Sequence, residues 1–260
     1  MAISVAPRVR ILDERWFFTG MALAMAVAAF VGFAPTYYLA AWNDAPKPVI
    51  TPSVHIHGAL CTAWILLLVV QARLIAARRL DIHRLTGIAG AVLAVATLVM
   101  GIIVAMGSER RVHTAANAGT LADPYVFLIL PLSAVGLFAL FAIIGIAIRK
   151  HPAAHKRMML LATMSLLGPA LARAATQAMT ALSGSGPTFA FTLVPGAGAL
   201  AALALIDVFL AALVVYDLLT RGRLHPATLW GGGFLLLSEP LRVAIGYSQP
   251  WQDFARMLMG

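Results

Sequence analysis

The sequence predicts an all-α membrane protein: a single domain, residues 1–260, that forms a bundle of seven transmembrane helices. Of its residues, 61% are hydrophobic and only 11% are charged, whereas about 25% of the residues in a soluble domain are charged. Several apolar runs of about 20 residues are long enough to cross the roughly 30 Å hydrocarbon core as helices. The runs are continuous rather than alternating, which argues against a β-barrel.

The seven expected spans follow these apolar runs in chain order. The first is too long for the apolar core of a typical cleaved signal peptide, so we expect it to remain in the protein. The second opens at Pro52, because proline suits the first turn of a helix. In the fifth, Gly168 and Pro169 predict a kink. The expected spans are 16–41, 54–77, 84–107, 124–148, 156–182, 192–218 and 228–248.

The third span carries a stripe of small residues at helical spacing. Such residues let two helices approach closely, so the stripe predicts helix packing. A segment rich in glycine and serine, 183–187, separates the fifth span from the sixth, and charged clusters bound the others. The stripe consists of Gly87, Gly90, Ala94, Thr97 and Gly101.

Lysine and arginine fall mainly on one side of this topology. Basic loops mark the cytoplasmic side of a membrane protein, so the N-terminus is expected in the cytoplasm and the C-terminus outside. An odd number of spans agrees with this orientation, and the basic face should attract anionic lipid head groups. The basic side holds Arg8, Arg10, Arg15, Arg73, Arg78, Arg79, Arg84, Arg149, Lys150, Lys156, Arg157, Arg221 and Arg223, and the other side holds Lys47, Arg110, Arg111 and Arg256.

Several functions are excluded by what the sequence contains and lacks. The net charge of +9 would suggest nucleic-acid binding in a soluble protein, but here the basic residues lie in loops between spans. No lysine lies in the interior of a span, since Lys156 stands at the very start of the fifth, and this excludes a retinal Schiff base. The sequence has neither a P-loop nor an HExxH motif. Its one cysteine, Cys61, cannot form an internal disulfide.

Three histidines open spans on the cytoplasmic side: His83, His155 and His225. A helix N-terminus disfavours a charged imidazole, so these side chains should be neutral. Neutral imidazole suits an interfacial helix cap and is also the form that binds a metal or haem iron. The sequence leaves both interpretations open.

Three others, His55, His57 and His113, lie toward the outer side, with His113 in a loop. His55 and His57 are two residues apart, so a helix turns them to different faces. We expect His55 at the interface and His57 in the bundle, as either an interior residue or a ligand. The face that His57 heads continues through Cys61, Trp64, Leu68 and Gln71.

Four ionisable residues fall well inside spans: Arg173, Asp207, Glu239 and Arg242. Each is costly in hydrocarbon unless it is paired or hydrated, so each is a candidate functional residue. One hypothesis is two ion pairs, Arg173 with Asp207 and Arg242 with Glu239. The other is a ligand pocket in the outer half of the membrane. Its expected lining is His55, His57, Trp64, Gln71, Arg173, Asp207, Glu239 and Arg242.

Two segments, QARLIAARRLDIHRLTGIAG (71–90) and HKRMMLLATMSLLGPALAR (155–173), resemble a family of predicted bacterial membrane proteins with no assigned function. The resemblance implies a multi-pass protein of the bacterial inner membrane. The matching positions are Gln71, His83, Arg84, Gly87, His155, Arg157, Met159 and Arg173.

More loosely, histidines at both ends of adjacent spans resemble cytochrome b561-type proteins. Those proteins bind two haems b and pass electrons across the membrane. They place paired ligands inside facing helices, whereas most histidines of this chain lie at helix ends.

Three functional hypotheses follow. In the first, haem b supports membrane electron transfer. His57 and His113 would bind an outer haem, and Arg173 and Arg242 would hold its propionates. His83 and His155 would bind an inner haem. In the second, a transporter, lipid-handling protein or sensor binds an anionic or polar ligand in the outer-half pocket. In the third, the chain is an accessory subunit, or a homo-oligomer, that uses an exposed small-residue stripe of the third span as its interface.

Overall fold

The computed structural model describes residues 13–42, 50–116, 124–184 and 197–259, without the side chains of 108–116, 124, 197–201 and 259. Within these ranges the regular elements are all helices, as the sequence predicts. They are α1 (Glu14–Phe33), η1 (Ala34–Tyr38), η2 (Ala40–Trp42), α2 (Pro52–Ala76), α3 (Leu80–Ala116), α4 (Pro124–Ala147), α5 (Pro152–Leu166), α6 (Gly168–Ser183), α7 (Ala197–Arg221), η3 (Ala227–Gly232), α8 (Gly233–Gly246) and α9 (Gln249–Met259).

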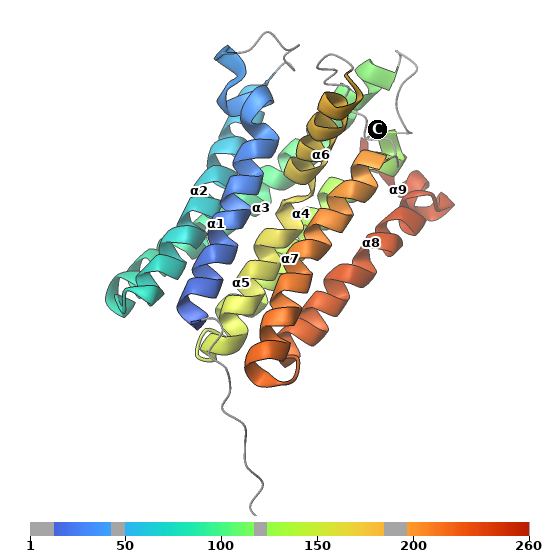
Figure 1. Ribbon diagram of the computed structural model, residues 1–260. Helices are drawn as coiled ribbons and strands as arrows, with labels where there is room; N and C mark the ends of the chain where they lie inside the picture. Colours follow the sequence, from blue (N-terminus) through green and yellow to red (C-terminus); the bar gives the residue numbers. More distant parts are fainter. Residues whose placement is uncertain (1–12, 43–49, 117–123, 185–196, 260) are drawn as a thin grey trace, which may run out of the picture.

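The long helices lie side by side in an elongated bundle (Figure 1). Five stretches are each long and apolar enough to cross a membrane: Glu14–Tyr38, Pro52–Ala76, Leu80–Gly107, Tyr125–Ala147 and Ala202–Arg221. The bent pair α5 and α6 adds a sixth if it counts as one span. The seventh expected span corresponds to η3 and α8, each of which is shorter than the 17 or more residues of a crossing helix. The chain therefore has the architecture of a helical membrane protein.

The predicted kink in the fifth span is confirmed. Helix α5 ends at Leu166 and α6 begins at Gly168, and the two axes differ by 53°. Pro169 has no backbone N–H for the preceding turn, and its ring obstructs a straight helix. The bend turns α6 toward α1, and the two helices pack together.

One expected position is wrong, and the first span is less regular than a plain α-helix. Helix α1 ends at Phe33, and the span continues through the π-helical segment η1, which holds Pro35, to Tyr38. His113 does not lie in a loop, because α3 continues to Ala116. Its charged segment contains glutamate and arginine, which are good helix formers, and no proline interrupts it.

The small-residue stripe of α3 faces the inside of the bundle. A Cβ added at Gly90 would meet Leu67 of α2 at 2.9 Å, and one at Gly101 would meet Val135 of α4 at 2.8 Å. Thr97, on the same stripe, is buried. The stripe thus serves packing within this chain, as predicted, and it is not the exposed interface that the accessory-subunit hypothesis requires.

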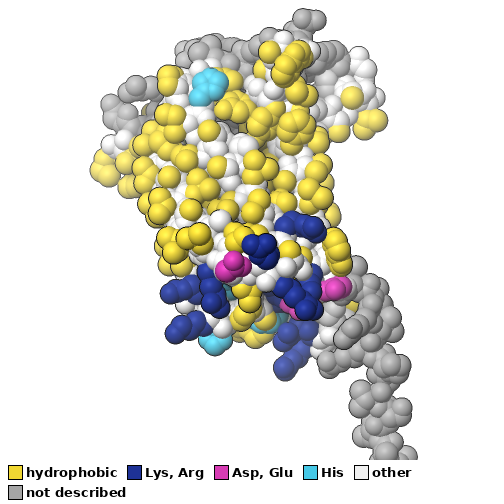
Figure 2. Space-filling view, turned by 90° about the vertical axis from the view of Figure 1, so that its left-hand side faces the viewer, with side chains coloured by type: hydrophobic (Ala, Val, Ile, Leu, Met, Phe, Trp, Pro, Cys, Tyr) yellow, Lys and Arg dark blue, Asp and Glu magenta, His cyan; other side chains and the backbone are white. Residues whose placement is uncertain are grey.

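The outer surface of the bundle is apolar over most of its length. Figure 2 shows a hydrophobic middle with lysine and arginine gathered at one end. Exposed aliphatic side chains at helical spacing, such as Leu85, Ile88, Val92 and Val95 of α3, form part of this surface. An apolar belt of this kind fits contact with the hydrocarbon of a bilayer. We call the charged end the basic end; it includes the start of α1 and the turns at 77–79, 148–151 and 222–226.

At Gly32 the backbones of α1 and α6 approach closely. A Cβ at this position would overlap the backbone carbonyl of Ala170. We therefore expect Gly32→Ala to lower the thermal stability of the detergent-purified protein by about 1–3 kcal/mol, as overpacking does. Gly20→Ala in the same helix is the control, because a Cβ added there would have no atom within 4 Å. Equal melting temperatures for the two variants would contradict this packing.

Candidate functional site

A buried ion pair joins three elements at the basic end. The Arg157 guanidinium of α5 donates through Nε and Nη2 to the Asp217 carboxylate of α7. The two side chains are 2% and 0% exposed. Asp217 also accepts from the Thr228 hydroxyl of η3 at 2.6 Å and from the backbone N–H of His225 at 3.1 Å. The carboxylate is thus fully enclosed by donors, which a buried charge requires.

Sequence reasoning missed Asp217. It lies in the second-to-last turn of α7, where the helix dipole disfavours a negative charge. An acidic residue at such a place needs a cationic partner, and Arg157 lies at the same predicted membrane depth. An acidic residue near a helix C-terminus, with an arginine at the same depth on another span, is the pattern from which this ion pair could have been predicted.

A second set of contacts ties α1 to the same cluster. Lys156, next to Arg157, forms an ion pair with Glu14. The Lys156 ammonium lies 4.3 Å from the centre of the Phe18 ring, an arrangement that attracts the cation to the ring face. Phe17 stacks on Tyr216 of α7 with ring centres 3.9 Å apart. The start of α1 is therefore fixed against both α5 and α7.

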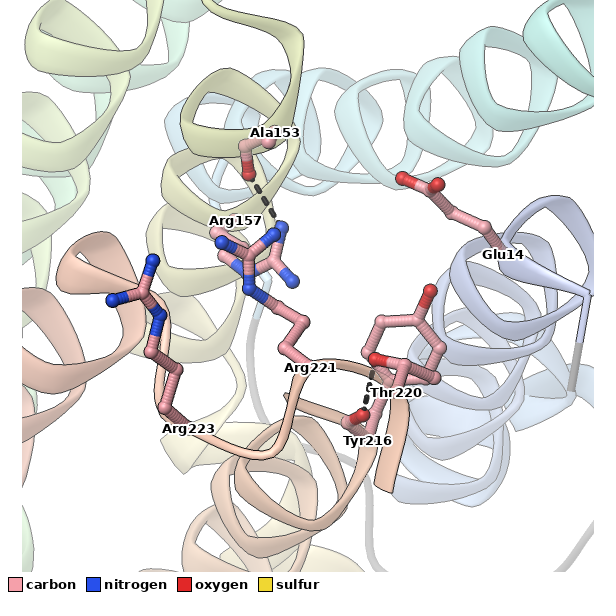
Figure 3. A pocket seen from close by; sticks show the side chains of 7 residues that line it. All are labelled: Glu14, Ala153, Arg157, Tyr216, Thr220, Arg221 and Arg223. Carbon is pink, nitrogen blue, oxygen red and sulfur yellow. Dashed lines mark hydrogen bonds between the residues drawn. The ribbon is translucent and has the colours of Figure 1, made fainter. Parts of the chain in front are cut away.

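Helices α1, α5 and α7, with the turn after α7, line an open cavity of about 540 Å³ at the basic end (Figure 3). Arg157 forms part of its wall and donates through Nη1 to the Ala153 carbonyl at 2.6 Å. Arg221 and Arg223 are exposed, and neither forms an ion pair with another described residue. The lining consists of Glu14, Ala153, Arg157, Tyr216, Thr220, Arg221 and Arg223.

His225, which the sequence placed at the start of the seventh span, caps η3. Its Nδ1 accepts from the backbone N–H of Ala227 at 3.0 Å. Partial burial and the positive charges of Arg157 and Arg221 hold the pKa of His225 below its ordinary value. The ring is therefore neutral at neutral pH and able to accept this bond. A bond from the first backbone N–H of η3 to the imidazole is the kind of contact that the capping interpretation expects.

His83 and His155 lie together at the basic end, between α3 and α5. Their ring centres are 6.5 Å apart and the rings are nearly perpendicular. The Nδ1 of His155 lies 2.7 Å from the Gly145 carbonyl, to which it can donate. The Nδ1 of His83 is buried without a hydrogen-bond partner. Gln71 donates to the His83 carbonyl and to Thr86 at 3.3 and 3.1 Å, which fixes the start of α3 against the end of α2.

The structure does not gather the residues expected in the outer-half pocket: Gln71 lies at the basic end beside the start of α3, and the others make separate contacts. His57 lies 3.6 Å from the sulfur of Cys61 through Nε2. The Trp64 indole N–H donates to the Thr163 hydroxyl at 3.1 Å, deep in the core. His55 packs beside the Tyr37 ring. The side chain of His113 lies outside the described residues, so its expected pairing with His57 stays a prediction.

The intramembrane arginines bond to their own helices. Arg173 donates to the Pro169 carbonyl at 3.0 Å and stands 4.7 Å from the centre of the Phe33 ring. Arg242 donates to the Ser238 carbonyl at 3.2 Å. Arg242 and Glu239 attract one another, but no ion pair within 4 Å joins these two described side chains. The expected close pair of Arg242 with Glu239 is therefore absent.

Comparison with known proteins identifies no relative of this chain. The chain matches no defined protein family, no curated protein and no solved structure. The resemblances drawn from the sequence motifs therefore stay predictions, and the candidate functions below rest on the chain's own residues.

The buried pair gives a sharp stability test. Asp217→Asn leaves the Arg157 charge buried without its counter-charge, which typically costs about 3–5 kcal/mol. We expect a large fall in the melting temperature of the purified protein. Replacing both residues by apolar ones, Arg157→Met with Asp217→Leu, should recover most of the loss.

Glu14→Gln is the matched control, because it breaks the Lys156 pair, whose glutamate is 60% exposed. We expect a loss below about 1 kcal/mol, as for other exposed pairs. Equal losses for Asp217→Asn and Glu14→Gln would show that the Arg157 pair is not the anchor of the basic end.

Proposed function

We propose that this chain is a multi-pass protein of the bacterial inner membrane that binds an anionic ligand, a phosphate or carboxylate head group, in the cavity at its basic end. In this proposal η3 and α8 together form the seventh crossing. The N-terminus and the basic end face the cytoplasm, and the C-terminus lies outside. The cavity lined by Arg157, Arg221 and Arg223 is the observation that carries the proposal.

The charge balance around the cavity favours an anion. Asp217 offsets Arg157, and Glu14 offsets Lys156. Arg221 and Arg223 remain as two positive charges without an acidic partner among the described side chains. Two guanidinium groups at the mouth of one cavity suit a phosphate or carboxylate, because their planar N–H forks match its oxygens.

Arg157 adds donors to the wall of the cavity. A guanidinium has five N–H donors, and three contacts to Asp217 and Ala153 use one each from Nε, Nη1 and Nη2. Each terminal nitrogen carries a second hydrogen, and in this proposal the hydrogen that borders the cavity donates to the ligand. Because the Asp217 pair fixes the guanidinium, little side-chain entropy is lost when these donors are used.

The cavity's position also suits a lipid head group. The cavity lies at the basic end, where charged side chains follow the apolar belt (Figure 2). In this proposal that boundary lies at the level of the lipid phosphates of one leaflet. Basic residues near an anionic leaflet contribute about 1 kcal/mol each to binding. Lipid phosphate and a soluble phosphate share this chemistry, and the test below separates them.

Removing the two unpaired arginines should weaken anion binding. For Arg221→Ala with Arg223→Ala, we expect a loss of about 2 kcal/mol, or about 30-fold in affinity. Native mass spectrometry of the detergent-purified protein, titrated with phosphatidylglycerol, phosphatidylcholine or inorganic phosphate, measures it. A lipid site prefers phosphatidylglycerol to both other probes, whereas a soluble-anion site also binds inorganic phosphate.

The control is Arg84→Ala with Arg149→Ala, which removes two exposed arginines of the same end that do not line the cavity. It should keep affinity within a few-fold of the original. If both double variants lose affinity equally, general surface charge explains the binding and the cavity site is rejected.

A second candidate function is haem b binding at His83 and His155. A metal ion about 2.0–2.1 Å from one nitrogen of each imidazole would hold the two ring centres on the order of 6 Å apart, and they are 6.5 Å apart. Because the Nδ1 of His155 bonds to the Gly145 carbonyl, its Nε2 is the nitrogen that would hold the iron. Iron held there would supply one-electron redox chemistry.

Absorption spectroscopy tests this candidate. If haem binds, the protein purified from haem-supplied cells shows a Soret band and contains iron, and His155→Ala loses both. His151→Ala, an exposed imidazole just before α5, should keep them. A colourless protein, or one that holds a metal without a Soret band, would reject haem.

A further inference from the structure

Helix α9 separates its polar and apolar side chains onto opposite faces. Four polar residues recur at positions three or four apart and bond to one another. Gln249 donates to the Asp253 carboxylate at 2.8 Å. Arg256 donates to the same carboxylate at 3.0 Å and to the Gln252 side-chain carbonyl at 3.2 Å. The other face carries apolar side chains at the same spacing, so α9 is amphipathic. They are Trp251, Phe254, Ala255 and Leu258, with Met257 beside them.

One part of the apolar face packs against the bundle and the other part does not. Ala255 is fully buried. The Trp251 indole N–H donates to the Tyr125 carbonyl of α4 at 2.8 Å, and the Arg256 guanidinium lies 5.5 Å from the centre of the Tyr125 ring. These contacts hold α9 against the first turn of α4. Three large side chains, which we call the apolar edge of α9, are 41–74% exposed: Phe254, Met257 and Leu258.

The contact with Tyr125 sets the level of α9 along the bundle. The apolar stretch of α4 runs over 23 residues from Tyr125 to Ala147, and the turn at 148–151, which belongs to the basic end, follows it. At about 1.5 Å per residue this stretch is about 35 Å long, slightly more than the roughly 30 Å hydrocarbon core of a bilayer. Tyr125 and α9 therefore lie at the boundary farthest from the basic end. Figure 1 likewise shows α9 at the end of the bundle opposite the turn at 222–226.

Lipid fits the apolar edge better than a protein partner does. Even an aromatic side chain buries only about 150–250 Å², so three partly exposed side chains fall short of the roughly 800 Å² per partner that a stable protein interface buries. The edge also continues the apolar belt of the bundle, because the last turns of α8, which lead into α9, expose Val243, Ile245 and Tyr247. A bilayer already in contact with that belt reaches the apolar edge without a further partner.

We propose that α9 is an interfacial anchor that lies in the plane of the membrane surface opposite the basic end. Its apolar edge inserts about 5–10 Å, to the boundary between lipid head groups and acyl chains, and the face with Asp253 and Arg256 stays in water. Trp251 suits this level, because tryptophan is enriched where a membrane protein meets the lipid–water boundary. The proposal rests on α4 as a span and not on the anion cavity, so either can fail without the other.

Spin labels on single cysteines measure the depth of α9 in nanodiscs of phosphatidylethanolamine and phosphatidylglycerol. The full-length protein carries Cys61→Ala and one label site: Phe254→Cys, Met257→Cys, Asp253→Cys or Gln249→Cys. Molecular oxygen concentrates in hydrocarbon, whereas a nickel chelate stays in water, and each relaxes a label that it reaches. We expect oxygen to relax the labels at 254 and 257 several-fold more than those at 249 and 253, and the nickel chelate to show the reverse order.

The labels at 249 and 253 are the matched controls, because they lie on the polar face of the same helix. Equal access of the nickel chelate to all four positions would place α9 in water and overturn the proposal. Shielding of 254 and 257 from both reagents would overturn it in favour of a protein contact, such as a second copy of the chain. All four replaced side chains are exposed, and gel filtration with circular dichroism verifies folding. If Cys61→Ala does not fold, the labels are read with Cys61 retained, and the signal of the unsubstituted protein is subtracted.

Discussion

The Arg157–Asp217 ion pair is the interaction on which the basic end depends. Two charges buried to this extent lose their hydration, so each is tolerable only while the other and its hydrogen bonds are present. Asp217 collects donors from α5, from His225 and from Thr228 of η3, and so it fixes where η3 begins. Because the Asp217 carboxylate neutralises Arg157, the excess positive charge at the cavity comes from Arg221 and Arg223.

A second constraint is the membrane itself, where polar groups must find partners within the protein. Most hydroxyls in the spans satisfy it locally: Thr62, Thr163 and Thr176 each donate to the carbonyl four residues earlier. Arg173 and Arg242 do the same with longer side chains.

Sequence patterns predicted what depends on local chemistry. Apolar run lengths gave the helical bundle, Gly168-Pro169 gave the kink, and the basic residues gave a charged end. The partners of those residues could not be predicted, because Arg157 and Asp217 are 60 positions apart in the chain and helical periodicity says nothing about which helices are neighbours. Arg242 and Glu239, three residues apart, attract one another without a close ion pair, because the Arg242 Nε donates to the Ser238 carbonyl of its own helix.

The buried pair at the basic end is continuous with the packing of α7 against η3. Asp217 of α7 bonds to Thr228 of η3, and Leu210 of α7 packs against Gly232 at the end of the same segment. A tight glycine contact next to the buried pair leaves the two segments little freedom to move separately. A ligand in the cavity therefore meets an Arg157 guanidinium whose position is set jointly by α5, α7 and η3, which favours a preorganised anion site over one that forms on binding.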